Sequence, residues 1–286
     1  MNRGRLSQLD GGVFLTDGGI ETTLIFQHGL ELPAFAAFSL LEDDEGTEHL
    51  RRYYAPYAEL AREHGVGLVL ESPTWRANPD WARRLGYSLE RLDELNRKAI
   101  ALLEELRAEY KGEQPIVISG CIGPQGDGYA PDSMLTPDEA EAYHAVQIGT
   151  FADTTADMVT AITMTYAEEA IGVARAAEAV GLPNVISFTL ETDGRLPSGQ
   201  TLSAAIEQVD EATRNAPAYY MLNCAIRRTS RTCLSPARRG PSESAGSART
   251  RRPRATRSWT RPNSWTKEIR QTWPSDMRRC GRSCPA

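Results

Sequence analysis

Short apolar runs alternate with helical patterns along the first 225 residues. The runs are apolar along their whole length, as expected of strands that are buried on both faces of a sheet. The six predicted strands lie at residues 13–16, 66–70, 116–119, 158–162, 185–189 and 219–222. The predicted helices lie at about residues 47–64, 89–110, 137–154, 167–180 and 201–213. This order predicts a parallel sheet covered by helices.

The architecture that fits this order is a (β/α)₈ barrel of the TIM type. The segment after the first strand, 16–21, lacks the G-x-G-x-x-G turn that a doubly wound dinucleotide-binding sheet would need. Eight units are expected of a barrel, and six are legible before residue 225. We therefore expect an α/β fold in the form of an incomplete barrel. Thr136, Pro137 and Glu139 supply the clearest helix start, an N-cap with a capping box.

The composition agrees with a globular protein of one large or two ordinary domains. Hydrophobic residues make up 41% of the 286 residues and charged residues 24%. No uncharged apolar run approaches the roughly 18 residues of a membrane span, and the start of the chain lacks a signal-peptide pattern. The five cysteines are scattered rather than arranged as a disulfide framework. We expect a cytoplasmic protein that does not bind a membrane.

The charge is divided between two regions of the chain. Residues 1–225 hold 16 Lys/Arg and 35 Asp/Glu, a balance of -19, whereas residues 226–286 hold 16 and 3, a balance of +13. The second region has three of the five tryptophans but only four Ile, Leu, Val, Met or Phe residues. No helix or strand period runs through it, so it is not expected to form a core.

We interpret residues 226–286 as a basic, low-order tail produced by out-of-frame translation. A constant shift of one base in compatible codons restores globular-looking sequence in three parts of the tail, including an acidic amphipathic helix in place of residues 255–282. The predicted domains are therefore a barrel at 1–225 and an aberrant tail at 226–286. The alternative for the tail is an arm that binds nucleic acid or another anionic partner.

Polar residues follow the predicted strands, where barrel enzymes carry their active sites. Asp17 and Gly18 follow the first strand, Glu71 and Trp75 the second, and Asn223 and Cys224 the sixth. Structural explanations exist for several of them, because Asp-Gly is common turn chemistry and Glu71 could serve in an ion pair. Cys121, after the third strand, is more typical of a small buried side chain than of a ligand. No serine-hydrolase elbow or common zinc-helix motif occurs.

Four motifs together resemble the homocysteine S-methyltransferase family. They are Leu15-Thr16-Asp17-Gly18-Gly19, Gly120-Cys121-Ile122-Gly123-Pro124, Ser187-Phe188-Thr189 and Asn223-Cys224. Members of this family are zinc-dependent (β/α)₈ barrels that move a methyl group from a sulfonium or quaternary ammonium donor to homocysteine sulfur. The resemblance implies an enzyme whose partners are a small thiol acceptor and a cationic methyl donor.

The resemblance also implies roles for single residues. Cys224 matches the first of three zinc-binding cysteines, an open arrangement that leaves the fourth position for substrate sulfur. Asn223 matches a residue of the binding site, and Asp17 with Gly18 matches the position that receives the amino-acid end of homocysteine. Trp75 is our candidate for an aromatic face toward the cationic donor, with Tyr129 second.

The chain departs from the family pattern in two places. The family's fourth strand typically ends with a glutamate that meets the substrate amino group, and Ile162 and Thr163 stand there instead. The acceptor could therefore be another thiol or a selenol. The adjacent cysteines of the family's Gly-Gly-Cys-Cys-Gly motif are missing, and Cys280 and Cys284 lie in no such context. We therefore expect this chain to bind Zn²⁺ poorly and to have impaired activity.

Two other functions compete with methyl transfer. In the first, the barrel is a metal-independent lyase or isomerase that uses Asp17 and Glu71 as acid and base. In the second, the barrel is inert and the tail binds an anionic partner such as nucleic acid. The methyl donor, the acceptor and the oligomeric state are left open by the sequence.

Overall fold

The computed structural model describes residues 6–126, 128 and 134–224. The chain divides into two compact units, Met1–Thr256 and Arg257–Ala286, and all described residues belong to the first. The predicted tail at 226–286 lies outside the described residues, and its interpretation as out-of-frame translation stays a prediction.

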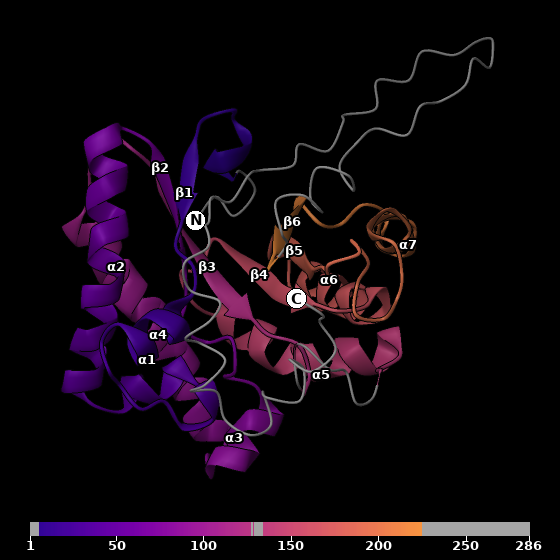
Figure 1. Ribbon diagram of the computed structural model, residues 1–286, viewed down its shortest axis with the longest axis horizontal. Coiled ribbons are helices and arrows are strands. Elements are labelled where there is room, and N and C mark those ends of the chain that lie inside the picture. The colour runs from indigo at the N-terminus through magenta and orange to yellow at the C-terminus, as the bar shows by residue number, and fades with distance from the viewer. Residues whose placement is uncertain (1–5, 127, 129–133, 225–286) are drawn as a thin grey trace. The chain divides into compact units, whose positions relative to one another are not determined.

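Six parallel strands form one curled sheet in chain order, so the described fold is a half-barrel of the predicted TIM type (Figure 1). The strands are β1 (Phe14–Thr16), β2 (Gly67–Glu71), β3 (Ile116–Ile122), β4 (Met158–Met164), β5 (Asn184–Thr189) and β6 (Tyr219–Asn223). Within the described residues, β1 pairs only with β2 and β6 only with β5. Each of the six predicted strands is confirmed to within a few residues.

Helices connect the strands, as the alternating pattern predicted. They are α1 (Ile20–Phe26), α2 (Asp44–His64), α3 (Pro79–Leu85), α4 (Leu89–Glu109), α5 (Pro137–Ala152), α6 (Ala167–Ala179) and α7 (Leu202–Thr213). The short α1 and α3, and the 3₁₀ turns η1 (Ser7–Leu9), η2 (Pro33–Phe35) and η3 (Ala37–Glu42), were not predicted. The capping box at the start of α5 is confirmed, since Thr136 and Glu139 exchange both hydrogen bonds.

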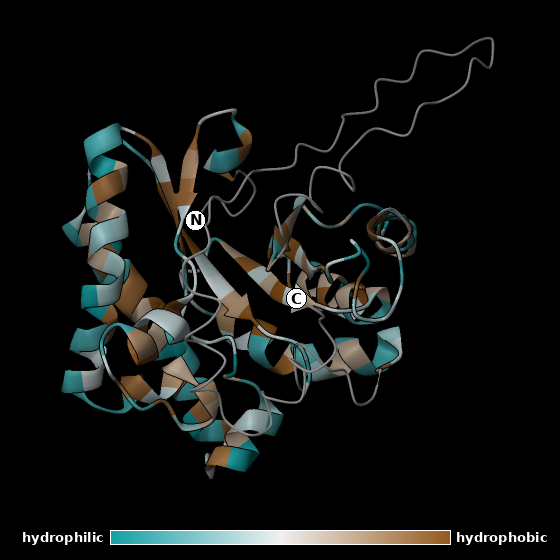
Figure 2. Cartoon of the chain, in the orientation of Figure 1, coloured by the Kyte–Doolittle hydropathy of each residue, from teal (hydrophilic) through white to brown (hydrophobic). Residues whose placement is uncertain are grey.

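The two faces of the sheet bury different sets of side chains. On the outer face, strand residues such as Leu68, Ile118 and Ile186 join the large core formed with the helices, and the strands are mostly hydrophobic in Figure 2. On the inner face, a smaller cluster unites Leu6, Val69, Val117, Met158, Val185 and Tyr219. This alternation explains why the strands read as continuous apolar runs, because both faces are covered.

The inner apolar cluster lies toward the amino ends of the strands and is closed by the N-terminal segment. Gln8 in η1 is buried there, and its Nε2 donates to Met158 Sδ (3.2 Å) and to Tyr219 Oη (3.2 Å). The carboxyl ends of the same strands are left for polar residues. Among the described residues, no helix has both the length and the apolar character needed to cross a bilayer.

Candidate functional site

Polar side chains gather on the inner face at the carboxyl ends of the strands. The parallel register pairs Glu71 on β2 with Ser119 on β3, and the Ser119 and Thr160 hydroxyls are bonded to each other (2.8 Å). Strands β2, β3, β4 and β6 end later than their predicted apolar runs, so Glu71, Cys121 and Asn223 lie inside the sheet rather than after it. The apolar run understates the strand because the inner positions become polar near its end.

Asp17 follows β1 directly and is buried. Its Oδ1 accepts from the Glu71 backbone N–H (2.8 Å), and its Oδ2 accepts from Tyr53 Oη on α2 (3.1 Å). Burial raises the pKa of Asp17 to about 7, although these two donors lower it. The carboxyl group is thus held in a fixed orientation and titrates near neutral pH.

Gly18 and Gly19 form the turn between Asp17 and helix α1. Gly19 has φ +69°, in the left-handed region that favours glycine. The Gly18 carbonyl accepts from Tyr57 Oη (3.2 Å), and Gly18 itself is exposed. The predicted substrate position therefore consists of a buried carboxyl group beside an accessible backbone turn.

Glu71 is the last residue of β2 and is only 6% exposed. Neither of its carboxylate oxygens accepts a hydrogen bond within the described part of the chain. Burial raises its pKa to about 8, Asp17 adds to the increase, and the hydroxyls of Ser119 and Thr160 oppose it. Among the described residues no cationic side chain is paired with Glu71, so the ion-pair explanation has no support in that part of the chain.

Glu21 and Cys121 also belong to this acidic region, and no motif in the sequence marked Glu21. Glu21, in the first turn of α1, is buried with a raised pKa of about 7, chiefly through burial. Cys121 is buried on β3, where burial and then repulsion from Glu71 raise its thiol pKa. Cys121 is thus the small buried side chain that the sequence favoured, with a thiol that stays protonated.

Asn223 organises a second group of residues, at the ends of β4, β5 and β6. Its Oδ1 accepts from the Thr163 backbone N–H (3.1 Å) and from Ser187 Oγ (2.9 Å), and its Nδ2 donates to Thr163 Oγ1 (3.0 Å). Thr163 has φ +70°, an outlier for a β-branched residue, at a bulge in the pairing of β4 with β5. Asn223 therefore fixes a strained position in the strand where the family pattern has an acid.

Cys224 follows β6 and is exposed. The Asn223 Nδ2 donates toward its sulfur at 3.5 Å. Asn223 and Cys224 thus lie at the carboxyl end of β6, and their roles toward substrate and metal stay predictions.

Trp75, in the loop after β2, lies beside the Asn223 group. Its Nε1 donates to the Ile162 carbonyl (3.1 Å), so it reaches the bulge of β4. The guanidinium carbon of Arg76 lies 5.1 Å from the Trp75 ring centre and 3.9 Å from that of Trp81. Trp75 already faces one protein cation, and its role toward a cationic donor stays a prediction. Tyr129, the second candidate, lies outside the described residues, as do Cys280 and Cys284.

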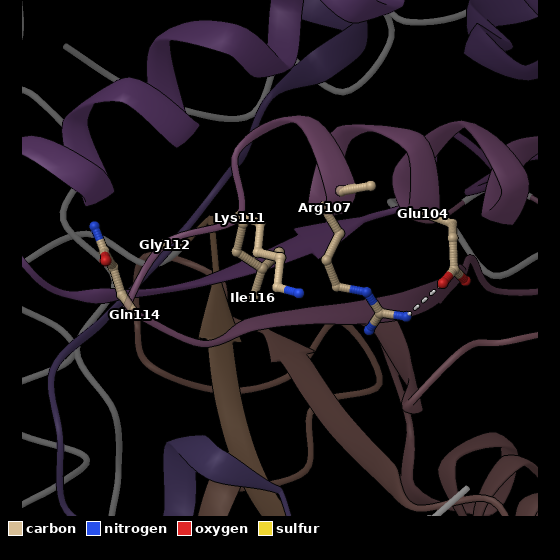
Figure 3. Close-up of a pocket in the computed structure, with 7 residues that line it drawn as sticks. Glu104, Arg107, Lys111, Gly112, Gln114 and Ile116 are labelled. Atoms are coloured by element: carbon tan, nitrogen blue, oxygen red, sulfur yellow. Dashed lines mark hydrogen bonds and ion pairs between the residues drawn. The ribbon is translucent and has the colours of Figure 1, made fainter.

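A cavity of about 340 Å³ lies away from both groups, where α4 leads into β3 (Figure 3). Its lining residues are Glu104, Arg107, Ala108, Lys111, Gly112, Gln114 and Ile116. Arg107 is paired with Glu104 (3.2 Å) and with Asp157 (2.8 Å), so its charge is compensated. The cavity lies at the amino end of β3, which in barrels supports stability rather than chemistry.

Known proteins share both the sequence pattern and the fold. Residues 14–281 match the model of the homocysteine S-methyltransferase family. The chain belongs to this family. The matched range continues past residue 225 into the segment that lies outside the described residues. The family and the relatives found in it are methyltransferases, which agrees with the resemblance carried by the four motifs.

Individual relatives of this homocysteine S-methyltransferase family member are distant. A selenocysteine Se-methyltransferase from Brassica oleracea var. italica is 23% identical over 221 residues, and the match covers 68% of this chain and 61% of that protein. The chain therefore spans about 61% of the length of this curated relative.

Solved structures of the homocysteine methyltransferase MmuM from Escherichia coli share the fold. The metallated form has a TM-score of 0.63 at 20% identity and covers 78% of each chain. The oxidized form also has a TM-score of 0.63 at 20% identity, with 76% of this chain and 75% of that chain covered. At this identity the likeness confirms the barrel-type fold alone.

The metallated relative raises the question of which residues here fit a metal ion. Within the part of the chain that the structure describes, no three His, Cys, Asp or Glu side chains are placed to hold one. Cys224 offers a single sulfur, whereas a catalytic zinc site needs three protein ligands. The described residues of this family member do not form a zinc site by themselves.

Proposed function

We propose that this barrel transfers a methyl group from a sulfonium or quaternary ammonium donor to the sulfur of a small thiol such as homocysteine. The observation that carries the proposal is the arrangement at the end of β6, where the Asn223 amide donates to the Cys224 sulfur beside the carboxyl ends of the other strands. Family membership over residues 14–281 supports the reaction class.

The chemistry needs a nucleophilic sulfur and a cationic donor. The acceptor sulfur forms a bond to the methyl carbon while the donor's bond to that carbon breaks, and the donor leaves as a neutral molecule. The proton of the acceptor thiol passes to solvent. Asp17 and the Gly18 turn would orient the acceptor, and the Trp75 ring would face the donor cation. Orientation of this kind supplies much of the acceleration in such direct displacements.

Zn²⁺ is the cofactor that we propose for the complete site, because it holds an acceptor thiol as the thiolate at neutral pH. Cys224 would be one ligand. The reducing cytoplasm is the compartment that suits a thiolate ligand, since oxidising compartments favour disulfides. We predict that the 286-residue chain holds far less than one zinc ion per molecule, because one thiolate does not make a three-ligand site.

Metal analysis of the purified chain tests this directly. We expect substoichiometric zinc, and little transfer from methyl-labelled sulfonium or quaternary ammonium compounds to homocysteine. Cys224→Ser should abolish what zinc remains, whereas Cys121→Ser, in a buried thiol of raised pKa, should not. Stoichiometric zinc in the wild-type chain would contradict our interpretation of residues 226–286.

Sequencing the gene across codons 220–232 tests whether a shift of the reading frame produced residues 226–286. We expect a single inserted or deleted base, and a chain expressed from the corrected frame should bind one zinc ion and transfer methyl groups. A confirmed frame together with full activity would show that the tail belongs to the working protein.

A second function is favoured by one observation. The Glu71 backbone N–H donates to the Asp17 carboxylate. Burial raises the pKa values of the Asp17 and Glu71 side chains to about 7 and about 8. Such values suit general acid–base catalysis at neutral pH in a metal-independent lyase or isomerase. Turnover that survives Cys224→Ala and zinc removal but is lost in Glu71→Gln would favour this function over methyl transfer.

A further inference from the structure

Glu71 differs from the other polar groups of the described inner face because both of its carboxylate oxygens are buried without a hydrogen-bond partner, whereas Gln8 and Glu21 each lack a partner at one oxygen. Ser119 is bonded to Thr160 and Ser187 to Asn223, and both oxygens of Asp17 accept hydrogen bonds. Glu71 is only 6% exposed, and neither of its oxygens has a hydrogen bond of acceptable geometry among the described residues. The hydroxyls of Ser119 and Thr160, which are bonded to each other, only partly offset the effect of burial on its pKa. An orphaned buried carboxyl group destabilises a fold, so its presence calls for a ligand that supplies the missing donors.

The surroundings of Glu71 define the chemistry of that ligand. Asp17 is its neighbour and Glu21 adds a third buried carboxyl group, so the region disfavours anions. A primary ammonium group carries positive charge and three N–H donors in a compact volume. A sulfonium or quaternary ammonium centre has the charge but no N–H, and it would leave the Glu71 oxygens without hydrogen bonds.

Strand β4 does not offer a competing acid. The Thr163 N–H and hydroxyl are both bonded to Asn223, and the Ile162 carbonyl accepts from Trp75. These contacts fix the end of β4 as a support for the Asn223 group rather than as a cation site. The inner-face carboxyl group left to bind an ammonium ion is the one on β2.

We infer that Glu71 is a specificity-determining residue that binds the primary ammonium group of an amino-acid acceptor and so distinguishes it from a thiol that lacks the amino group. The inference rests on the proposed function for the identity of the acceptor. The inference assigns to β2 the binding of the substrate amino group, which the family pattern gives to a glutamate at the end of the fourth strand. A charge-assisted hydrogen bond in a buried site favours the amino ligand by roughly 10-fold or more.

Calorimetric titration of the full 286-residue chain under reducing conditions tests the inference. The two probes are homocysteine and 4-mercaptobutanoate, which lacks only the amino group. Wild type should bind homocysteine about 10-fold or more tightly, and Glu71→Gln should reduce the preference to less than about 3-fold. Glu71→Asp, with the carboxylate withdrawn by one methylene, should give an intermediate preference. The ligand-free Glu71→Gln protein should also melt at a higher temperature than wild type, because the variant removes an uncompensated buried acid.

Glu169→Gln is the matched control, since Glu169 is also a buried glutamate but is bonded to His144 (3.0 Å) and to the Gln125 N–H (2.6 Å). This variant should melt lower and keep the preference for homocysteine. An unchanged preference in Glu71→Gln, or no binding of either probe by wild type, overturns the inference. Loss of the preference in Glu71→Gln, together with no methyl transfer by the chain expressed from the corrected frame, contradicts the proposed function and leaves the role of Glu71 standing.

Discussion

The inner face of the sheet has two halves that differ in what they do with buried side chains. Toward the amino ends, Val69, Val117 and Met158 pack together, and the one polar residue among them, Gln8, has partners for its amide nitrogen. Toward the carboxyl ends, two residues further along the same strands, the face becomes polar, and Glu71 has no hydrogen-bond partner among the described residues. One set of strands thus supplies both packing and chemistry.

The two halves of the inner face contribute to the stability of the fold with opposite sign. Burial of apolar surface in the amino half is favourable by roughly 25 cal/mol per Å². Burial of Asp17 and Glu71 in the carboxyl half is unfavourable, as their raised pKa values indicate. Functional sites commonly carry such a cost. Truncation of an apolar side chain in the amino half and neutralisation of Glu71 in the carboxyl half should therefore change stability in opposite directions.

The largest effect is expected in the amino half. Met158→Ala should lower the free energy of unfolding by about 2–5 kcal/mol, because the fully buried side chain leaves a cavity and Gln8 loses an acceptor. Urea denaturation followed by circular dichroism measures this. Met134→Ala, at a position 62% exposed, should change stability by less than about 0.5 kcal/mol. Equal effects of the two substitutions would show that the inner cluster is not a core.

The sequence predicted the sheet well because its signal is local. Each strand is a short apolar run, and each long helix spans several turns over which a period can be recognised. Helices α1 and α3 have seven residues each, too few for a period to show. The start of α3 nevertheless carries a local helix-start signal in the sequence, since Asn78 caps the helix and Pro79 takes the first helical position.

The site was predictable only where a strand end marks it. Asp17, Asn223 and Cys224 follow or end strands, and the structure places them at the carboxyl end as expected. Tyr53 holds Asp17 from a helix 36 residues away in the chain, and no local pattern links the two. Whether Glu71 has hydrogen-bond donors depends on side chains of β3 and β4 as well as β2. Its lack of such donors among the described residues is therefore visible only in the folded structure.

The carboxyl half should show itself in the pH dependence of stability. Asp17 and Glu71 have higher pKa values in the folded chain, about 7 and about 8, than their ordinary values of 3.8 and 4.5. The folded state therefore holds more protons, and stability should fall as pH rises from about 5 to about 8.5. Urea denaturation at three pH values measures the slope.

Substitution of Glu71 tests whether this residue contributes to the fall of stability with pH. Glu71→Gln should flatten it, because the folded chain then has one acid fewer to deprotonate. Glu178→Gln, which alters an exposed glutamate of α6, should leave the slope at its wild-type value. Stability that rises with pH over this range in wild type would mean that the two buried carboxyl groups are compensated by charges.

The smallest change in stability is expected at Asn223, and it compares the two groups of polar residues within the carboxyl half. Asn223→Ala should lower the free energy of unfolding by about 1–3 kcal/mol, because Thr163 loses the bonds to its N–H and hydroxyl while it keeps its strained φ of +70°. Ser187→Ala, which removes one of the bonds to Asn223, should cost about 0.5–1.5 kcal/mol. If Asn223→Ala instead stabilised the chain as Glu71→Gln is expected to do, the whole carboxyl half would be strained for ligand binding. A loss confined to Asn223 would divide that half into a structural support at β4 to β6 and an unsatisfied acidic site at β1 and β2.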